Sequence, residues 1–347
     1  MSEDKELEYP ENPEFNQSID EDIGEIFIYG EQFQPSYILF ELKRETYRIA
    51  LTEFEESQFE ELQEAVFNRF PALIAYNYRL SVRGPGANDP VKKFLHLKDA
   101  WEGAINILNA LAMGEIRAKG INAKNATVFH SGNPGLHFTA KIIRTDELKQ
   151  RLENVRAIVK FSKDNALGLH IESISPTVLD ALYKLQDNRN SFSHTSTPTK
   201  EQAVEQLIIV EPLFHEVLKE LRFLENVKIV RFDSFTDHCR FEIFTGHYLN
   251  KEYDEDIILP QEKLGVVLAS AGEEIFVQWG NDIFSLSPFL HYCNDTTGHE
   301  TYLCFFKGKK DSKYWFEPIK TRNELAFDAI HNRFDVEHSE LSRLLVP

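Results

Sequence analysis

The segment between Asp89 and Gly120 constrains the fold of this chain more than any other part of the sequence. Asp89 is a good helix N-cap, Pro90 suits the first helical position, and Gly120 is typical just beyond a helix end. Between them, apolar side chains recur at spacings of three and four residues: Phe94, Leu97, Trp101, Ile105, Leu108 and Ala112. The pattern predicts one long amphipathic helix over about 90–118, whose apolar face must be covered by other elements.

Further helical segments follow and can provide that cover. A helix is expected after Thr145, another from the cap at Ser175-Pro176, and a third from Thr199, which forms a capping box with a glutamine three residues later. A β-like stretch over 121–143 predicts a hairpin between the helices. Together these segments predict an α-helical bundle over residues 70–225.

The N-terminal part of the chain is strongly acidic. Residues 1–25 hold ten acidic side chains and one lysine, which is typical of a disordered, solvated tail. Residues 26–69 form an extension to the bundle, with two short β-like runs, Ile26–Tyr29 and Tyr37–Phe40. An acidic amphipathic helix is expected from about Glu55.

After residue 225 the hydrophobic period changes from that of a helix to that of a strand. Residues 226–347 therefore predict a β-rich module, closed by a helix near Asn323 to Leu344. Its expected strands are Val227–Arg231, Phe241–Ile243, Val266–Leu268, Ile275–Val277, Ile283–Ser285 and Tyr302–Phe305. The predicted fold class is α+β, a helical bundle followed by a small, mainly antiparallel β module.

Charge is distributed unevenly along the chain, whose formal net charge is -18. Residues 1–64 hold 4 Lys and Arg against 19 Asp and Glu, residues 65–225 hold 21 against 17, and residues 226–347 hold 13 against 20. The middle segment is thus mildly basic. This removes the electrostatic objection to an RNA substrate for that segment, although it does not by itself indicate one.

Composition and targeting signals predict a cytoplasmic protein. With 42% hydrophobic residues, the chain is too apolar to be wholly disordered. It has no run of about 18 apolar residues, and acids stand where a signal peptide carries basic residues, so we expect neither secretion nor membrane association. Three cysteines are too few for a disulfide framework.

Common cofactor and nucleotide motifs are absent. The sequence contains no P-loop, no dinucleotide-binding glycine motif, no nucleophile elbow and no H-E-x-x-H. Four residues have the chemistry of zinc ligands, but their spacing matches no compact ligand pair: His291, Cys293, His299 and Cys304. We therefore expect no metal and no cofactor.

One group of polar residues lies where the bundle should be apolar. Continuing the stripe of the helix that opens at Ser175-Pro176 places Arg189 at a seam position, if the helix persists that far. A guanidinium facing a helical interface is costly unless a carboxylate, a phosphate or a wet cleft receives it. His194 follows within about one turn, so both side chains could reach one phosphate.

Arginine and histidine together are sufficient to cleave RNA without a metal. A neutral imidazole can take the proton of the ribose 2′-hydroxyl, and an imidazolium can protonate the leaving 5′-oxygen. A guanidinium can bind the charge that develops on the phosphorus centre through two parallel hydrogen bonds. The Asn190 amide could orient the phosphate or the ribose, or simply cap the helix.

The run Arg189-Asn190-Ser191-Phe192-Ser193-His194 resembles the R-x₄₋₆-H signature of the HEPN superfamily (higher eukaryotes and prokaryotes nucleotide-binding domain). Members of that family are helical bundles, many of them metal-independent endoribonucleases of toxin, antiphage and RNA-processing systems. They typically dimerise so that two motifs face one another. The resemblance covers about residues 70–225. Many active members have glycine or a small residue after the histidine, whereas Thr195 follows here.

The resemblance implies a function and a set of site residues. Arg189, Asn190 and His194 would be catalytic, RNA would be the substrate, and a homodimer would form along the 178–192 seam. The family's first helix often supplies an acidic or polar partner, for which Asp99 and Glu102 are candidates only, because a solvated helix face is the more common place for such residues. A regulatory protein or trigger could act at the C-terminal module.

Three other Arg–His pairs also fall within the R-x₄₋₆-H spacings but lack the context. Arg231/His238 and Arg240/His247 fall in expected strands, and Arg333/His338 is flanked by acids that would repel a phosphate. Two alternatives to the ribonuclease stay open. The bundle could be a catalytically inert HEPN-like scaffold for dimerisation or partner binding, or the acidic segment 1–64 could make the chain a protein-interaction protein.

Overall fold

The computed structural model describes residues 9–130, 133–192, 198–235, 239–247, 252–254, 261–268, 274–294, 301–310, 312–320, 324–328 and 332–347. The chain divides into two compact units, Met1–Glu64 and Ala65–Pro347. The second unit contains both the helical bundle and the β-rich module. In the part of the chain that is described, no helix combines the length and the apolar character that crossing a membrane requires.

The first unit has more regular structure than the sequence indicates. Its elements are α1 (Pro13–Ile23), β1 (Ile26–Ile28), β2 (Glu31–Phe33), α2 (Pro35–Leu42) and the first part of α3 (Arg44–Arg69). The strand β1 confirms the first β-like run, and β1 pairs with β2 as an antiparallel hairpin. The other expectations for this unit need correction.

Residues 13–23 are not a disordered tail, and residues 37–40 are not a strand. In α1, the Asn12 side chain accepts a hydrogen bond from the Phe15 amide, and Phe15 is buried. The helix α2 begins at Pro35 and contains residues 37–40, the apolar run that was predicted to be a strand. The acidic helix begins at Arg44 rather than near Glu55. Burial of aromatic side chains from these helices outweighs the acidic composition.

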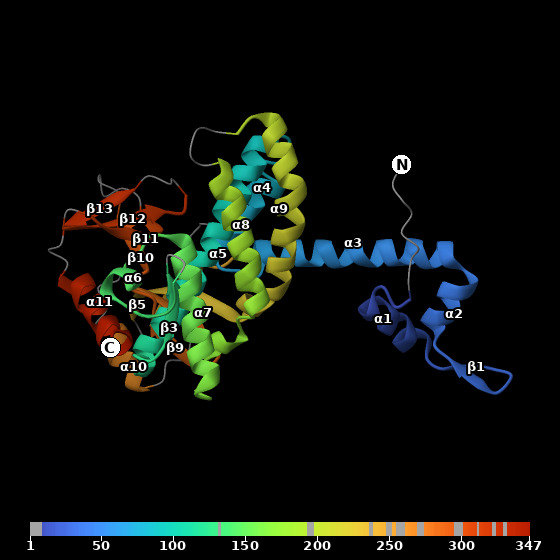
Figure 1. Cartoon of the computed structure of the whole chain (residues 1–347), viewed down its shortest axis with the longest axis horizontal. Helices are drawn as coiled ribbons and strands as arrows, with labels where there is room; N and C mark the ends of the chain where they lie inside the picture. Colours follow the sequence, from blue (N-terminus) through green and yellow to red (C-terminus); the bar gives the residue numbers. More distant parts are fainter. Residues whose placement is uncertain are drawn as a thin grey trace. The chain divides into compact units, whose positions relative to one another are not determined.

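The second unit begins with the helical bundle (Figure 1). Its elements are α4 (Ala72–Val82), α5 (Pro90–Lys119), β3 (Thr127–His130), β4 (Asn133–His137), α6 (Ala140–Ile143), α7 (Leu148–Asp164), η1 (His170–Ser173), α8 (Pro176–Phe192) and α9 (Lys200–Glu220). The predicted long helix is confirmed as α5, with the Asp89 side chain capping its start and Gly120 in the left-handed conformation at its end. The hairpin and the capping box at Thr199 are also as expected.

The helix α5 is the centre of this unit and is buried on every side, not on one face. Every residue from Ala100 to Ile116 is buried, and α5 contacts α4, α7, α8 and α9 as well as the strand β9. The helices α4 and α5 approach closely at Gly103, where an added Cβ would lie 2.8 Å from the Leu73 carbonyl carbon and closer still to its oxygen. A helix that is covered all round cannot be amphipathic, and its sequence is accordingly rich in alanine and glycine.

The β module consists of two antiparallel sheets. Five strands lie in the order β7-β6-β5-β8-β9 and four in the order β10-β11-β12-β13. Their bounds are β5 (Val227–Phe235), β6 (Cys239–Ile243), β7 (Glu252–Asp254), β8 (Ile275–Trp279), β9 (Asp282–Ser285), β10 (Leu290–Asn294), β11 (Thr301–Lys310), β12 (Lys313–Pro318) and β13 (Leu325–Asp328). The short turn η2 (Arg222–Asn226) precedes β5, and the closing helix is α11 (Asn332–Leu345). The α+β fold class is therefore confirmed.

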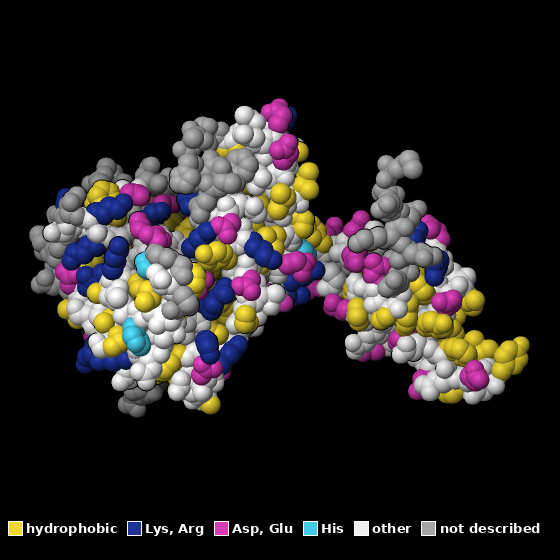
Figure 2. Space-filling model, viewed as in Figure 1, with side chains coloured by type: hydrophobic (Ala, Val, Ile, Leu, Met, Phe, Trp, Pro, Cys, Tyr) yellow, Lys and Arg dark blue, Asp and Glu magenta, His cyan; other side chains and the backbone are white. Residues whose placement is uncertain are grey.

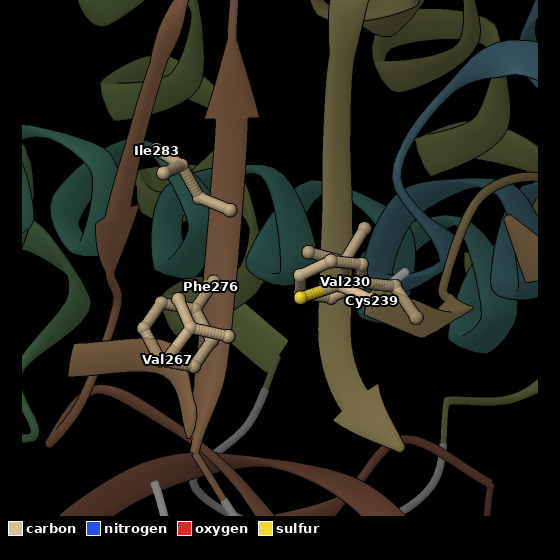
Figure 3. Packing of buried hydrophobic residues seen from close by; sticks show 6 residues of the cluster. Val230, Cys239, Val267, Phe276 and Ile283 are labelled. Carbon is tan, nitrogen blue, oxygen red and sulfur yellow. The ribbon is translucent and has the colours of Figure 1, made fainter. Parts of the chain in front are cut away.

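One expected strand of this module is a helix. Residues 266–268 belong to α10 (Gln261–Leu268), whose Val267 packs with buried residues of the five-stranded sheet (Figure 3). A short apolar run is compatible with a strand or with a buried helix, and only its packing distinguishes the two.

Arg151, on α7, joins the bundle to the β module. Its guanidinium is buried and donates hydrogen bonds to the Thr145 carbonyl oxygen (3.0 and 3.1 Å), to the Phe306 carbonyl oxygen of β11 (2.6 Å) and to the Asn106 side chain of α5. Burial lowers the pKa of Arg151 to about 10, which leaves it charged at neutral pH. The arginine therefore satisfies polar groups from three separate segments at once.

Substitution of Gly103 tests the contact between α4 and α5. We expect Gly103→Ala to lower the free energy of unfolding by about 1–3 kcal/mol, because the new methyl group must push Leu73 away. The matched control is Gly265→Ala in α10, where an added Cβ meets nothing within 4 Å. That change should stabilise by up to about 1 kcal/mol, as alanine is the better helix former. Urea unfolding measures both, and similar effects would contradict the proposed close packing.

Substitution of Arg151 tests the connection between bundle and β module. We expect Arg151→Met to cost about 3 kcal/mol in the free energy of unfolding, because two buried acceptors and one partly buried acceptor lose this donor. The control is Arg156→Met on the same helix, where the guanidinium is 39% exposed and pairs with the exposed Asp180. That change should stay within about 0.5 kcal/mol. Equal losses in the two variants, measured by urea unfolding, would show that Arg151 makes no special contribution.

Candidate functional site

The helix α8 brings Arg189 into the bundle. The Ser175 hydroxyl accepts a hydrogen bond from the Val178 amide (3.2 Å), as expected of an N-cap, and the helix continues to Phe192. Arg189 thus lies within the last turn of a continuous helix. The helix therefore persists as far as the predicted seam position of Arg189 requires.

Arg189 is paired with a buried carboxylate on the central helix. Its Nε lies 3.0 Å from Oε1 of Glu102, although the N–H is not aligned well enough for a hydrogen bond. The Glu102 side chain is 5% exposed and that of Arg189 is 33% exposed. Among the described residues this is the only ion pair that Arg189 forms. Apart from Nε, the guanidinium carries two further nitrogens that can donate hydrogen bonds.

Of the two acidic candidates on the central helix, the structure brings only Glu102 to Arg189. A solvated surface position is excluded for Glu102 by its burial. Asp99 lies one turn earlier, where its carboxylate is 3.0 Å from the Lys98 ammonium. A buried carboxylate needs a cation, and Arg189 provides one across the interface between α5 and α8.

The other two expected catalytic residues cannot be placed. Asn190 belongs to α8, but its side chain lies outside the described residues. His194 also lies outside them, between the end of α8 and the Thr199 cap of α9. Their roles stay predictions. Arg189 and Glu102 are the part of the expected site for which geometry is available.

The seam that was expected to form a homodimer interface faces the chain's own core. Val178, Leu182 and Leu185 are each at most 1% exposed. The neighbouring helices α5, α7 and α9 contact α8 and cover it. Residues 178–185 of the seam are therefore covered within one chain, and the homodimer stays a prediction.

Further polar side chains share the buried face of α5 with Glu102, and sequence reasoning missed them. Asn106 and Asn109 follow Glu102 at spacings of four and three, and both are buried. The Asn106 side chain accepts a hydrogen bond from Arg151. Gln186 of α8 is also buried. The available signal was the regular spacing of polar residues inside a helix whose other positions are apolar.

The competing Arg–His pair at the C-terminus is structural. The Arg333 guanidinium is engaged by two carboxylates, those of Glu274 and Glu337. His338 is fully buried, stacks on Tyr314 with ring centroids 5.9 Å apart, and has no hydrogen-bond partner on either ring nitrogen. Burial lowers the pKa of His338 to about 3, so it cannot serve as a base that is half protonated near neutral pH.

The zinc-type residues do not form a metal site where they are described. His291 packs against the rings of Phe316 and Phe334, at 5.4 and 5.0 Å between centroids. Cys293 and Cys304 are buried on neighbouring strands. His299 lies outside the described residues.

A different cluster has ligand atoms close enough to share a metal, but a lysine lies among them. Atoms of Glu115, His170 and Asp282 lie within 4.8 Å of one another. The Lys119 ammonium is 3.0 Å from the Glu115 carboxylate and 3.3 Å from that of Asp282. Both Glu115 oxygens also accept backbone amides, from His170 and Ile171. Lys119 supplies the positive charge that a metal would bring, so the cluster is an ion-pair network joining α5, η1 and β9.

Comparisons with known proteins found no matching family model, no matching curated protein and no matching solved structure. The functional argument therefore depends on the chemistry of the site itself.

Replacement of His338 should change how stability depends on pH. The unfolded chain titrates this histidine near pH 6.5, whereas the folded chain binds the proton only near pH 3. Between these values the unfolded state holds the extra proton, so the free energy of unfolding falls as the pH falls. From pH 7 to 5 this residue contributes a loss of about 2 kcal/mol.

We expect His338→Leu to lose that part of the pH dependence in urea unfolding at pH 7 and pH 5. The control, Phe289→Leu, disturbs the packing around His338 without removing a titratable group. It should be less stable at both pH values but retain the original dependence. An unchanged dependence in His338→Leu would show that this histidine does not titrate differently in the two states.

Proposed function

We propose that this protein is a metal-independent endoribonuclease of the HEPN type, a regulated toxin or antiphage effector that cleaves cellular or phage RNA. The observation that carries the proposal is the Arg189–Glu102 pair. A partly exposed guanidinium in the last turn of a helix is held by a buried carboxylate and lies five residues before His194. The resemblance implies this combination of arginine, acidic partner and following histidine.

The proposed roles follow from the chemistry of each group. Arg189 would bind the phosphate through its terminal nitrogens, because Glu102 occupies the Nε side. His194 would remove the 2′-hydroxyl proton as the 2′-oxygen attacks phosphorus. An imidazolium, from the same residue or from the second motif of a dimer, would protonate the departing 5′-oxygen. The products would carry a 2′,3′-cyclic phosphate and a 5′-hydroxyl.

In this proposal Glu102 is a positioning residue. Its carboxylate touches the arginine, not the substrate, and its burial fixes the orientation of the guanidinium. Removing the charge of Glu102 leaves Arg189 free to adopt other rotamers. Phosphate binding should then weaken, while the histidine chemistry is unaffected.

The surface charge supports modest, salt-sensitive RNA binding. Figure 2 shows Lys and Arg side chains interspersed with Asp and Glu on the visible face of the second unit, without a broad area of one sign. On this face few phosphate contacts are expected, and affinity there should depend on local recognition as well as on charge. Regulation is physically sensible, because an unrestrained ribonuclease would damage its own cell.

The same ion pair also favours a second candidate function, a catalytically inert HEPN-like scaffold. A guanidinium that is already neutralised inside its own chain needs no phosphate. In a scaffold, Arg189 and Glu102 would contribute only to the stability of the interface between α5 and α8. The two functions predict different results in a cleavage assay.

The test is incubation of the purified chain with total RNA and tRNA in EDTA, with analysis of the product ends. We expect cleavage by the original chain and a loss of at least about 10²-fold in Arg189→Ala and His194→Ala. Glu102→Gln should weaken cleavage about 10-fold, mainly by raising KM. The matched controls are Arg156→Ala and His137→Ala, which remove surface residues of the same types and should keep full activity.

Circular dichroism and urea unfolding establish that each variant is folded. Equal cleavage by the original chain and by the Arg189 and His194 variants would overturn the site assignment. A folded chain that cleaves neither RNA, and whose Arg189→Ala variant loses only stability, would support the scaffold.

A further inference from the structure

A two-stranded hairpin in the first unit exposes three large apolar side chains in succession. Phe27 is 62% exposed, Ile28 is 40% exposed and Tyr29 is completely exposed. Figure 1 shows the hairpin projecting from α1 and α2, with its turn pointing away from both helices. Among the described residues, β1 and β2 pair only with each other, so the outer edge of each strand carries backbone groups without a β partner.

The turn of the hairpin holds a tyrosine in a conformation that tyrosine rarely adopts. Ile28 pairs with Glu31, so Tyr29 and Gly30 form a two-residue turn, and their φ angles are 50° and 86°. Such a turn favours Asn-Gly, because a bulky side chain is strained at positive φ. Tyr29 buries no surface against the described part of the chain that would offset this strain. Strained residues of this kind are typical of functional positions.

The exposed apolar surface continues beyond the hairpin. Ile23, Tyr37 and Leu42 of the flanking helices α1 and α2 are each at least 40% exposed. Figure 2 shows apolar side chains gathered on the hairpin and along the adjoining lower side of the first unit, with Asp and Glu side chains around them. An apolar area with a polar rim is typical of a surface that binds a partner.

The charge around this surface excludes several classes of occupant. Residues 9–42 hold eight Asp and Glu and no Lys or Arg, and residues 1–64 hold 19 acidic against 4 basic side chains. This charge repels RNA phosphates, anionic lipid headgroups and the same segment of a second copy. It attracts a protein surface that is rich in Lys and Arg. The occupant that matches both the apolar and the acidic character is therefore a basic protein segment with apolar side chains.

We propose that the hairpin binds an extended, basic segment of a partner protein, in which apolar residues alternate with Lys or Arg. The segment would add a third strand, with its apolar residues on the face of Phe27 and its cations on the opposite face, where Ile28 pairs with Glu31. An isolated two-stranded hairpin is only marginally stable in water, and a third strand would stabilise it. The inference is independent of the ribonuclease proposal and uses none of its residues.

The test measures the binding of defined peptides to the full chain by calorimetry. The main probe is Lys-Val-Lys-Val-Lys-Val-Lys, and two matched peptides replace every Val with Ser or every Lys with Glu. We expect saturable binding of the Lys-Val peptide that weakens as the salt concentration rises, at least about tenfold weaker binding of the Lys-Ser peptide and none of the Glu-Val peptide. N-methylation of each backbone amide of the Lys-Val peptide should also weaken binding at least about tenfold, because an added strand needs those donors.

Two substitutions test the two faces of the hairpin. Phe27→Ser should weaken binding of the Lys-Val peptide about tenfold, and Glu31→Gln should weaken it about threefold. The matched control for the first is Phe59→Ser, which removes an exposed phenylalanine of α3 in the same unit. That variant should bind the peptide as the original chain does.

Substitution of Tyr29 separates a binding role from a structural one. Asparagine suits the positive φ better than tyrosine, so Tyr29→Asn should leave the unfolding temperature unchanged or raise it, while the affinity for the Lys-Val peptide falls about tenfold. A purely structural residue would move stability and affinity in the same direction. Unchanged affinity in both Tyr29→Asn and Phe27→Ser would overturn the proposal.

Other occupants of the hairpin give different results. Sedimentation velocity detects self-association of the full chain, and flotation with phosphatidylserine vesicles detects membrane binding. Self-association or vesicle binding that is lost in Phe27→Ser would overturn the proposal in favour of a second copy or a membrane. Equal binding of the Lys-Val peptide and either matched peptide, equal binding after N-methylation, or no saturable binding of the Lys-Val peptide would also overturn it. Circular dichroism establishes that each variant is folded.

Discussion

The buried guanidinium of Arg151 is the interaction on which the rest of the second unit depends. It binds a carbonyl group at the start of its own helix, a side chain of the central helix α5 and a carbonyl group of the strand β11. The Asn106 and Phe306 acceptors are buried, so losing this donor would be costly. The arginine thus links the bundle directly to the sheet within one compact unit, alongside the packing of α5 on β9 and α11.

That arrangement places the central helix α5 in contact with the chain on every side, and its polar residues become the chemically active positions. Near one end, Glu102 holds Arg189. Near the other end, Glu115 anchors η1 through two backbone amides. A polar group on a fully covered helix either has a hydrogen-bond or ion-pair partner, or its burial lowers the stability of the fold. The proposed function concerns one such group, Arg189, whose Nε lies 3.0 Å from the buried Glu102 carboxylate.

The sequence predicted much of the scaffold and only part of the site. The caps at Asp89, Ser175 and Thr199 predicted the starts of three helices, because capping is a contact between residues close in the chain. Short apolar runs were less informative: the segments at 37–40 and 266–268 are helical, since packing decides between strand and helix there. The sequence identified Arg189 as a residue that needs a partner. It left Asp99 and Glu102 as candidates for the acidic partner, and the packing of α5 against α8 showed that Glu102 is the one.

The sequence by itself determined that this chain has a central long helix within a bundle, an acidic N-terminal part and a C-terminal β module, because periodicity, caps and composition are local properties. Only the tertiary structure decided that Val178, Leu182 and Leu185 of α8 face inward and that Glu102 is the acid beside Arg189. The physical reason is that buried polar groups are satisfied by residues distant in the chain. Arg151 and the Phe306 carbonyl, for example, are 155 residues apart in the sequence.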